Sequence, residues 1–162
     1  MCAEYSKYLC VMETPVGMLA IEDDGLGITA VSFCDDEEIP PHTILQKQAV
    51  KELKEYFAGK RKEFDLPLTM SGTEFQLDDW NALCTIPYGY TYSYGDIAEQ
   101  IGHPKAYRAV GSANHANPIA IIVPCHRVVG SDGKTRGYGG GQEKQAYLLA
   151  LERKYSGKNN GK

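Results

Sequence analysis

The sequence contains no long hydrophobic run and no export signal. None of its apolar stretches approaches the roughly 18 residues that a membrane-spanning helix requires. Its first residues show no basic region followed by an apolar stretch and a small-residue cleavage site. We therefore expect a cytoplasmic protein. With 162 residues, of which 43% are hydrophobic, the chain can build one large domain or two small ones.

The sequence also lacks the spacing of a disulfide framework or a zinc site. Its 5 cysteines are an odd number and include no C-x-x-C pair. Its 4 histidines do not fall at zinc-like offsets from a cysteine pair. Reduced thiols are the simplest interpretation, so we expect neither a metal nor a disulfide. The residues concerned are Cys2, Cys10, Cys34, Cys84 and Cys125, and His42, His103, His115 and His126.

A net basic charge, the usual property of a nucleic-acid-binding protein, is missing as well. The formal net charge is -4, but the charges are unevenly distributed. Residues 1–89 hold 7 Lys and Arg against 16 Asp and Glu, a balance of -9, whereas residues 90–162 hold 10 against 5, a balance of +5. A polyanion should therefore meet the second half. Charge alone favours the simpler explanation, which is solvated lysines on an ordinary surface.

The first part of the chain predicts a small sheet and a helix. Apolar residues in 8–12, 18–22 and 28–33 are separated by turn residues, which indicates a three-stranded antiparallel meander. Apolar residues then recur at helical spacing over 43–57, before Gly59. A helix packed on an antiparallel sheet is the expected unit.

The second part predicts helices. Residues 60–72 resemble a linker with one short strand, in which Phe64, Leu66 and Leu68 alternate around Pro67. Helices are expected over 73–83, 93–101 and 105–116, and the last two, joined across Gly102, have the pattern of a helix-turn-helix. A third range, 155–162, is polar and predicts a disordered tail.

The chemistry of the chain concentrates at Cys125. Five apolar residues and Pro124 precede it, and His126 and Arg127 follow it. A thiol reacts as the thiolate, which requires a neighbouring base or positive charge. Adjacent residues of an extended segment point to opposite faces, so His126 needs a turn or a bridging water to take the cysteine proton. Without further context, an inert buried thiol beside an ordinary core histidine is the favoured interpretation of such a pair.

Several motifs in order supply that context. Pro124 to Val128 reads P-C-H-R-V, and it is accompanied by S-Y-G-D-I-A at 93–98, R-A-V-G-S-A at 108–113, N-P at 117–118 and G-Y-G-G-G at 137–141. This set resembles the O6-alkylguanine-DNA alkyltransferase family in order and spacing over residues 73–154. Residues 1–70 resemble the family only by their pattern of strands and helix.

The resemblance implies an α+β fold of two domains. Residues 1–70 would form a ribonuclease-H-like domain with a small antiparallel sheet and a helix. Residues 73–154 would form a mostly helical, winged-helix-type alkyltransferase domain that contains the helix-turn-helix. Residues 155–162 would be the disordered tail.

The resemblance also implies the catalytic residues. Cys125 would accept the alkyl group, and His126 would deprotonate it through a water molecule. Glu152 would orient and polarise the histidine, in the manner of a catalytic triad. Asn117 would brace the turn beside the cysteine.

For DNA, the resemblance implies a minor-groove approach and extrusion of the damaged base. Arg108 would fill the vacancy in the base stack, and Tyr94 would contact the extruded base. The small residues Ala109 and Ser112 would allow the helix to approach the groove closely. Minor-groove readout is degenerate, so little sequence specificity is expected.

Three further residues would hold the extruded guanine. Val128 would offer its backbone carbonyl, Tyr138 would pack on the base, and the backbone of Gly139 would donate to the alkylated oxygen. A glycine-rich turn of ordinary function is the alternative for this loop. Asn114 departs from relatives that place a large apolar residue there, which leaves the preference for bulky adducts open.

The implied reaction is one displacement per protein molecule, from O6-alkylguanine or O4-alkylthymine in double-stranded DNA. It requires no metal and no organic cofactor. We expect a monomer that acts on the DNA of the nucleoid. A thioether product is not reversed by thiol exchange. Two rival functions remain open. A cysteine hydrolase would use Cys125, His126 and Glu152 and turn over, and a helix-turn-helix regulator would bind DNA without a covalent step.

Overall fold

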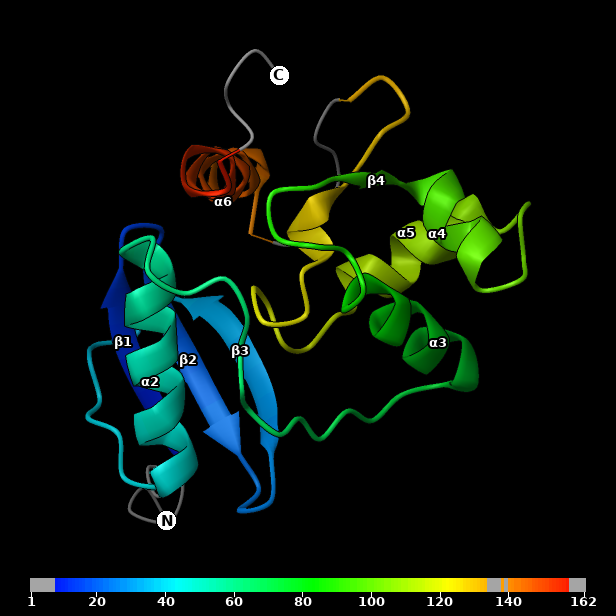
Figure 1. Cartoon of the computed structure of the whole chain (residues 1–162). Helices are drawn as coiled ribbons and strands as arrows, with labels where there is room; N and C mark the ends of the chain where they lie inside the picture. Colours follow the sequence, from blue (N-terminus) through cyan, green and yellow to red (C-terminus); the bar gives the residue numbers. More distant parts are fainter. Residues whose placement is uncertain (1–7, 134–137, 139, 158–162) are drawn as a thin grey trace. The chain divides into compact units, whose positions relative to one another are not determined.

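The computed structural model describes residues 8–133, 138 and 140–157, and the chain divides into two compact units. The first consists of Met1–Met70 with Pro118–Ala120, and the second of Ser71–Asn117 with Ile121–Lys162. Each unit has its own elements (Figure 1). No helix among the described residues is both long and apolar enough to cross a membrane.

The first unit contains the predicted meander. Strands β1 (Leu9–Thr14), β2 (Gly17–Asp23) and β3 (Ile28–Cys34) form one antiparallel sheet in sequence order. The turn between β1 and β2 requires a φ of 107° at Gly17, which a residue without Cβ adopts readily. Three consecutive residues are buried in the middle of β1 and of β2, so the central part of the sheet is covered on both faces.

Helix α2 (Ile44–Phe57) covers a face of this sheet (Figure 1). It begins with a capping box, in which Thr43 accepts from the backbone of Gln46 and the Gln46 side chain accepts from the backbone of Thr43. Its buried apolar residues include Ala49, Leu53 and Tyr56, each 0% exposed. The predicted helix is confirmed, and it ends before Gly59, which has a φ of 77°.

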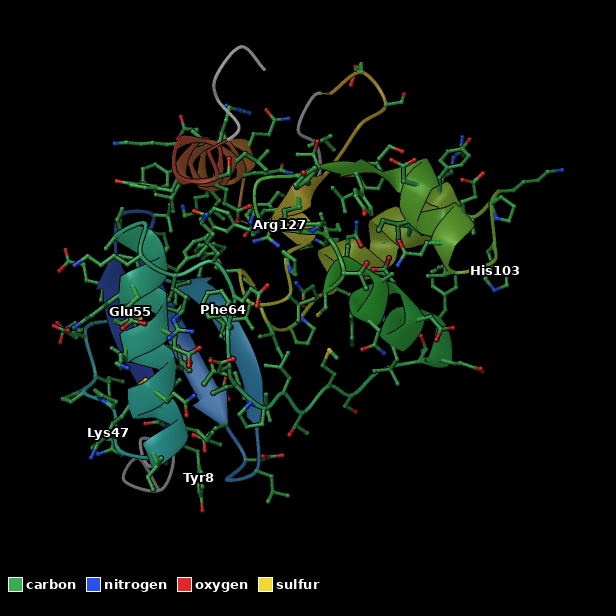
Figure 2. The ribbon with its side chains drawn as sticks, in the orientation of Figure 1. Tyr8, Lys47, Glu55, Phe64, His103 and Arg127 are labelled. Atoms are coloured by element: carbon green, nitrogen blue, oxygen red, sulfur yellow. The ribbon has the colours of Figure 1, made fainter. Side chains whose placement is uncertain are left out.

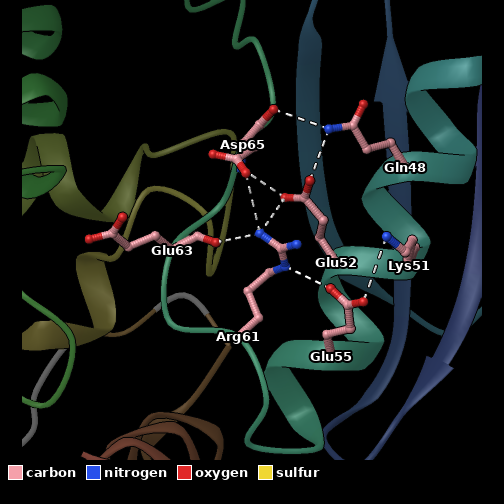
Figure 3. Close-up of polar contacts among 7 residues, drawn as sticks. All are labelled: Gln48, Lys51, Glu52, Glu55, Arg61, Glu63 and Asp65. Carbon is pink, nitrogen blue, oxygen red and sulfur yellow. Dashed lines mark hydrogen bonds and ion pairs between the residues drawn. The ribbon is translucent and has the colours of Figure 1, made fainter.

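The segment after α2 is held to the helix by Arg61 (Figure 3). Its Nε donates to Glu55 at 2.8 Å, and its guanidinium donates to the carbonyl of Glu63 at 2.9 Å. The buried Glu52 accepts from the backbone of Asp65 at 2.9 Å. These bonds engage the backbone groups of Glu63 and Asp65 that a strand would pair with a neighbouring strand. The predicted short strand is therefore wrong.

A single parallel bridge replaces that strand. It joins Leu68 to Ile28, with Ile28 donating to the carbonyl of Pro67 at 2.8 Å. Pro67 itself has no N–H to donate, which prevents a longer ladder.

The second unit contains the predicted helices α3 (Glu74–Leu83), α4 (Tyr94–Gln100) and α5 (Tyr107–His115). Thr73 and Ser93 cap the first two through capping boxes. Helix α5 has no side-chain cap and begins at Tyr107, because the residues just before it form a turn closed by the bond from Ala106 to the carbonyl of His103.

Four shorter or later elements complete the described part of this unit. Strands β4 (Tyr92–Ser93) and β5 (Val128–Val129) pair in parallel, and the 3-10 helix η1 (Cys125–Arg127) lies just before β5. Helix α6 (Gln142–Tyr155) packs against η1. Tyr155 is helical, so the predicted tail is wrong for this residue, and residues 158–162 lie outside the described part of the chain.

Trp80 joins α3 to α5 in the core of the unit. Its side chain is 2% exposed, and its Nε1 donates to the carbonyl of Ala113 at 2.8 Å. A buried indole N–H without a partner would be unfavourable, so this bond fixes the orientation of the ring. It also fixes helix α5, which contains Ala113.

We expect Trp80→Phe to lower the free energy of unfolding by about 1–3 kcal/mol, because the hydrogen bond is lost and a void remains. Urea unfolding followed by circular dichroism measures this change. The matched aromatic substitution Tyr147→Phe, at a site 42% exposed, should change it by less than about 0.5 kcal/mol. Equal effects of the two substitutions would contradict this role for the indole.

Candidate active site

Cys125 stands at a sharp backbone turn. Pro124 has φ -84° and ψ 64°, and the N–H of Cys125 donates to the carbonyl of Val123 at 2.8 Å, the geometry of an inverse γ-turn. The 3-10 helix η1 follows at once. The chain around Cys125 therefore turns and is not extended. Cys125 and His126 are thus not forced to point to opposite faces, as adjacent residues of a strand would be.

The backbone before this turn is strained. Ile121 has a φ of 73°, a left-handed conformation that costs a β-branched residue of the order of 1–3 kcal/mol. Its side chain is 1% exposed, so burial holds it in place. The strain lies four residues before Cys125, in the segment that presents the sulfur.

Asn117 holds both the turn and the sulfur. Its Nδ2 donates to the carbonyl of Val123 at 2.8 Å and lies 3.2 Å from Sγ of Cys125. The cysteine is partly exposed. An amide donor directed at sulfur favours the thiolate, so Asn117 can both orient the nucleophile and stabilise its charge.

His126, Arg127 and Glu152 form a buried cluster. Nε2 of His126 lies 2.7 Å from Oε2 of Glu152. Arg127 donates from Nε to Oε1 at 2.8 Å and from Nη2 to Oε2 at 3.0 Å. The side chains are 0%, 7% and 1% exposed, respectively. Glu152 thus ties α6 to η1 through two adjacent residues.

Arg127 has a role that sequence reasoning did not assign. Besides its two bonds to Glu152, it donates from Nη1 to the carbonyl of Ile86 at 2.7 Å. Figure 2 labels this side chain. Glu152 also accepts from the backbone of Gly89 at 3.2 Å. No sequence motif predicts these bonds to backbone groups, because any residue can supply a backbone carbonyl or N–H.

Gln145 of α6 was missed for the same reason. Its Nε2 donates to the carbonyls of His126 and Val128, both at 3.1 Å. The carbonyl of Val128 therefore already has one donor. A carbonyl oxygen has two lone pairs, so a second donor can still bind it.

The protonation of the site follows from burial and from these bonds. Burial raises the pKa of the Cys125 thiol to about 11, although the Asn117 hydrogen bond lowers it. Burial also lowers the pKa of His126, against the opposing effect of Glu152. For Glu152, burial alone would raise the pKa, but the bonds and charges of His126 and Arg127 lower it overall. At neutral pH the site holds a thiol, a neutral imidazole and a carboxylate.

One ring nitrogen of His126 is available for proton transfer. Its Nδ1 is buried and has no hydrogen-bond partner among the residues that the structure describes. Because Nε2 is engaged with Glu152, the pairing leaves Nδ1 as the atom that can accept a proton. The tautomer with the proton on Nε2 fits the carboxylate acceptor.

Tyr138 packs against this histidine. The two ring centroids are 6.4 Å apart with an interplanar angle of 80°, an edge-to-face contact. The tyrosine is 9% exposed, and burial raises its pKa, with the charges of Cys125 and Glu152 adding to the effect. Gly139, the neighbouring residue of interest, lies outside the described residues.

A groove opens beside the start of α4. It has a volume of about 540 Å³. Tyr94 is among its lining residues, and the ring of Tyr94 lies over Gly111 of α5. Because β4 pairs with β5, the chain just before Tyr94 is held next to the chain just after η1. The lining residues are Ser93, Tyr94, Gly95, Tyr107, Gly130, Ser131 and Asp132.

The remaining candidates lie on α5. Arg108, Ala109 and Ser112 are exposed. The structure therefore brings together Cys125, His126, Glu152 and Asn117, with Tyr138 and Val128 around them, and places a second, exposed set on the helix. Among the described ranges, no three His, Cys, Asp or Glu side chains are grouped as metal ligands.

This arrangement can perform nucleophilic chemistry with general-base assistance. It contains a thiol at a turn, an amide donor to the sulfur, a neutral imidazole and an orienting carboxylate. The exposed helical face beside it can meet an extended ligand.

Comparisons with known proteins agree with both units. Residues 74–154 match the family model "6-O-methylguanine DNA methyltransferase, DNA binding domain", and residues 5–70 match "6-O-methylguanine DNA methyltransferase, ribonuclease-like domain". A methylated-DNA–protein-cysteine methyltransferase of Methanosarcina acetivorans is 47% identical to this chain, over 90% of this chain and 97% of the relative.

Solved structures give the same result. The O6-methylguanine methyltransferase of Mycobacterium tuberculosis superposes with a TM-score of 0.84 at 46% identity, covering 91% of this chain and 93% of that one. A structure of the M. tuberculosis protein in complex with DNA gives 0.83 at 47% identity, covering 90% and 92%. The predicted mixed α/β fold is confirmed. The chain belongs to the 6-O-methylguanine DNA methyltransferase family, whose curated relatives are methylated-DNA–protein-cysteine methyltransferases.

Proposed function

We propose that this protein repairs DNA by moving the alkyl group of O6-alkylguanine onto Cys125. The observation that carries the proposal is the pairing of Cys125 with Asn117, 3.2 Å from the sulfur, next to a buried His126 that Glu152 holds at 2.7 Å. Family membership supports the same chemistry.

The proton of the thiol goes to His126. With the pKa of Cys125 raised to about 11, little thiolate exists at neutral pH, so a base must act during the reaction. Nδ1 of His126 accepts the proton through a bridging water, and the carboxylate of Glu152 stabilises the imidazolium that forms. Arg127 keeps that carboxylate ionised.

The sulfur then attacks the alkyl carbon. A carbon–sulfur bond forms while the bond between that carbon and O6 of guanine breaks, and the electron pair leaves with the guanine. Tyr94 is a candidate donor of the proton that neutralises the base. The thioether resists thiol exchange and simple hydrolysis, so each molecule acts once. The same displacement applies to O4-alkylthymine.

The damaged base reaches the sulfur only if it leaves the helix. A relative has been crystallised in complex with DNA, and here the exposed side chains of α5 offer the matching surface. Arg108 fills the vacated position, and Ala109 and Ser112 allow a close approach to the minor groove. Tyr138 and the carbonyl of Val128 receive the base, with the backbone of Gly139 as a further donor. A monomer suffices for this reaction.

A duplex that contains one O6-methylguanine should leave a single methyl group on the Cys125 peptide, one per protein molecule. Peptide mass spectrometry and the recovery of guanine in the duplex measure this outcome. A Cys125→Ser variant should bind the duplex and transfer nothing. Repeated turnover without a modified peptide would indicate a hydrolase, and binding without transfer would indicate a regulator.

The pH dependence of transfer should reveal His126 as the base. Because burial lowers the pKa of His126 below 6.5, the imidazole is neutral at neutral pH, and the rate should fall only in acid, as the ring gains a proton. His126→Gln should be slower at pH 7 by roughly 100- to 10,000-fold.

The shape of the profile separates a base from a structural role. The variant's rate should rise about tenfold per pH unit, as for an unassisted thiol, whereas the wild type should lack this slope between pH 7 and 9. Parallel profiles for the two proteins would exclude His126 as the base.

Arg108→Ala should weaken binding to a lesion-containing duplex and slow repair by at least about tenfold, because the vacated stack loses its filler and a cation is lost. Fluorescence anisotropy and single-turnover repair measure these effects. Arg153→Ala, which removes the same charge from an exposed position of α6, is the matched control and should change both by less than about threefold. Equal losses in the two variants would reduce the role of Arg108 to general electrostatics.

A further inference from the structure

A carboxylic acid is buried behind the cysteine, and the mechanism above does not use it. Asp79 of α3 is 0% exposed. The side chain of Asn114 on α5, 7% exposed, faces it. With the Asn114 amide turned to satisfy both groups, its Nδ2 lies 2.6 Å from Oδ2 and 3.1 Å from Oδ1 of Asp79. A buried acid in apolar surroundings is costly unless it is bonded, so the pair needs a reason.

A short chain of bonds leads from this pair to the sulfur. The carbonyl of Asn114 accepts from the N–H of Asn117 at 3.1 Å, at the end of α5. The side chain of Asn117 in turn donates to Sγ of Cys125 at 3.2 Å. Asp79 therefore fixes the residue whose backbone positions the donor to the nucleophile. The four residues lie within one compact unit.

The bond between Asp79 and Asn114 has two possible directions. An ionised carboxylate accepts from the amide nitrogen, whereas a protonated acid donates to the amide oxygen after the amide turns over. A separation of 2.6 Å suits a strong bond in either direction. The pair can therefore stay bonded in both protonation states, while the charge behind the cysteine changes by one.

That change falls near neutral pH, because burial opposes the charged form of the acid. Burial raises the pKa of Asp79 to about 7. The negative charge of Asp79 is among the causes that raise the pKa of Cys125. The cations of η1, His126 when protonated and Arg127, are bonded to Glu152.

The other charged residues of the packed helices are exposed. These exposed residues are Glu74 and Asp78 of α3, Asp96 and Glu99 of α4, and Arg108 and His115 of α5. Cys125, in contrast, has a pKa that the charge of Asp79 raises.

We propose that Asp79 is a positioning residue of this site, which with Asn114 holds Asn117 against the sulfur and, on losing its proton, makes Cys125 less ready to lose its own. The proposal rests on the function assigned above only through the identity of the nucleophile. The pair then controls the reactivity of the thiol. Its effect is opposite to that of His126 and Glu152, because the negative charge of Asp79 disfavours the thiolate.

The test uses the full-length protein and iodoacetamide, with alkylation of the Cys125 peptide followed by mass spectrometry from pH 6 to 10. Asp79→Asn keeps the shape and the bond but removes the charge. It should react roughly 3- to 10-fold faster than the wild type above pH 8, where Asp79 is ionised, and should differ little at pH 6. Asp78→Asn, an exposed neighbour on the same helix, should follow the wild-type profile throughout.

Identical profiles for the wild type and Asp79→Asn would overturn the proposal. A merely structural role would change the rate equally at every pH, and this outcome would overturn it as well. Iodoacetamide requires no DNA, so a failure here leaves methyl transfer by the wild type unaffected, and a failure of methyl transfer leaves this test readable.

A measurement on the wild type covers the case in which Asp79→Asn does not fold. Carbon-13 NMR of the side-chain carboxyl of Asp79 should show its titration near neutral pH. Titration of Asp79 in the ordinary acidic range would overturn the proposal.

Discussion

The site depends on one buried carboxylate. Glu152 accepts hydrogen bonds from His126 and Arg127, two consecutive residues of η1. Its negative charge offsets the positive charge of Arg127. Removing a single partner from such a cluster leaves an uncompensated charge in the interior, which is strongly destabilising. The same bonds orient the imidazole and anchor the turn that carries Cys125. Stability and reactivity therefore share one group.

Burial strengthens this cluster, and it also keeps Cys125 protonated as the less reactive thiol. A thiol with a pKa of about 11 is a poor target for oxidants and electrophiles, because these react with the thiolate. Asn117, whose Nδ2 lies 3.2 Å from the sulfur, has the opposite effect and favours the thiolate. The proposed transfer would consume the protein, and a cysteine that stays protonated until the substrate binds would suit such a reaction.

Backbone geometry presents this nucleophile, and it is held under strain. The positive φ of Ile121 and the γ-turn at Pro124 both precede Cys125. The left-handed conformation of Ile121 is unfavourable by itself and is maintained by the burial of its side chain, whereas the γ-turn is supported by the bond from Asn117 to Val123. The candidate DNA-contacting residues of α5, by contrast, are exposed.

The sequence by itself determined the three-stranded meander and the positions of the main helices, and it singled out Cys125 as the candidate nucleophile. Capping residues such as Thr43, Thr73 and Ser93 lie within three residues of the groups they satisfy, so local pattern locates the helices. The P-C-H-R-V motif identified Cys125 for the same reason. The short strand around Phe64 failed because bonds to Arg61 and Glu52, invisible in the alternating pattern, occupied that segment.

Only the tertiary structure decided which groups surround the cysteine. Arg127 meets Ile86 across 41 positions of the chain and Glu152 across 25. The partner of Asp79 lies on another helix, and its sequence neighbours gave no sign of it. Such bonds depend on how helices pack and often involve backbone carbonyls, which every residue possesses, so no local residue pattern can encode them.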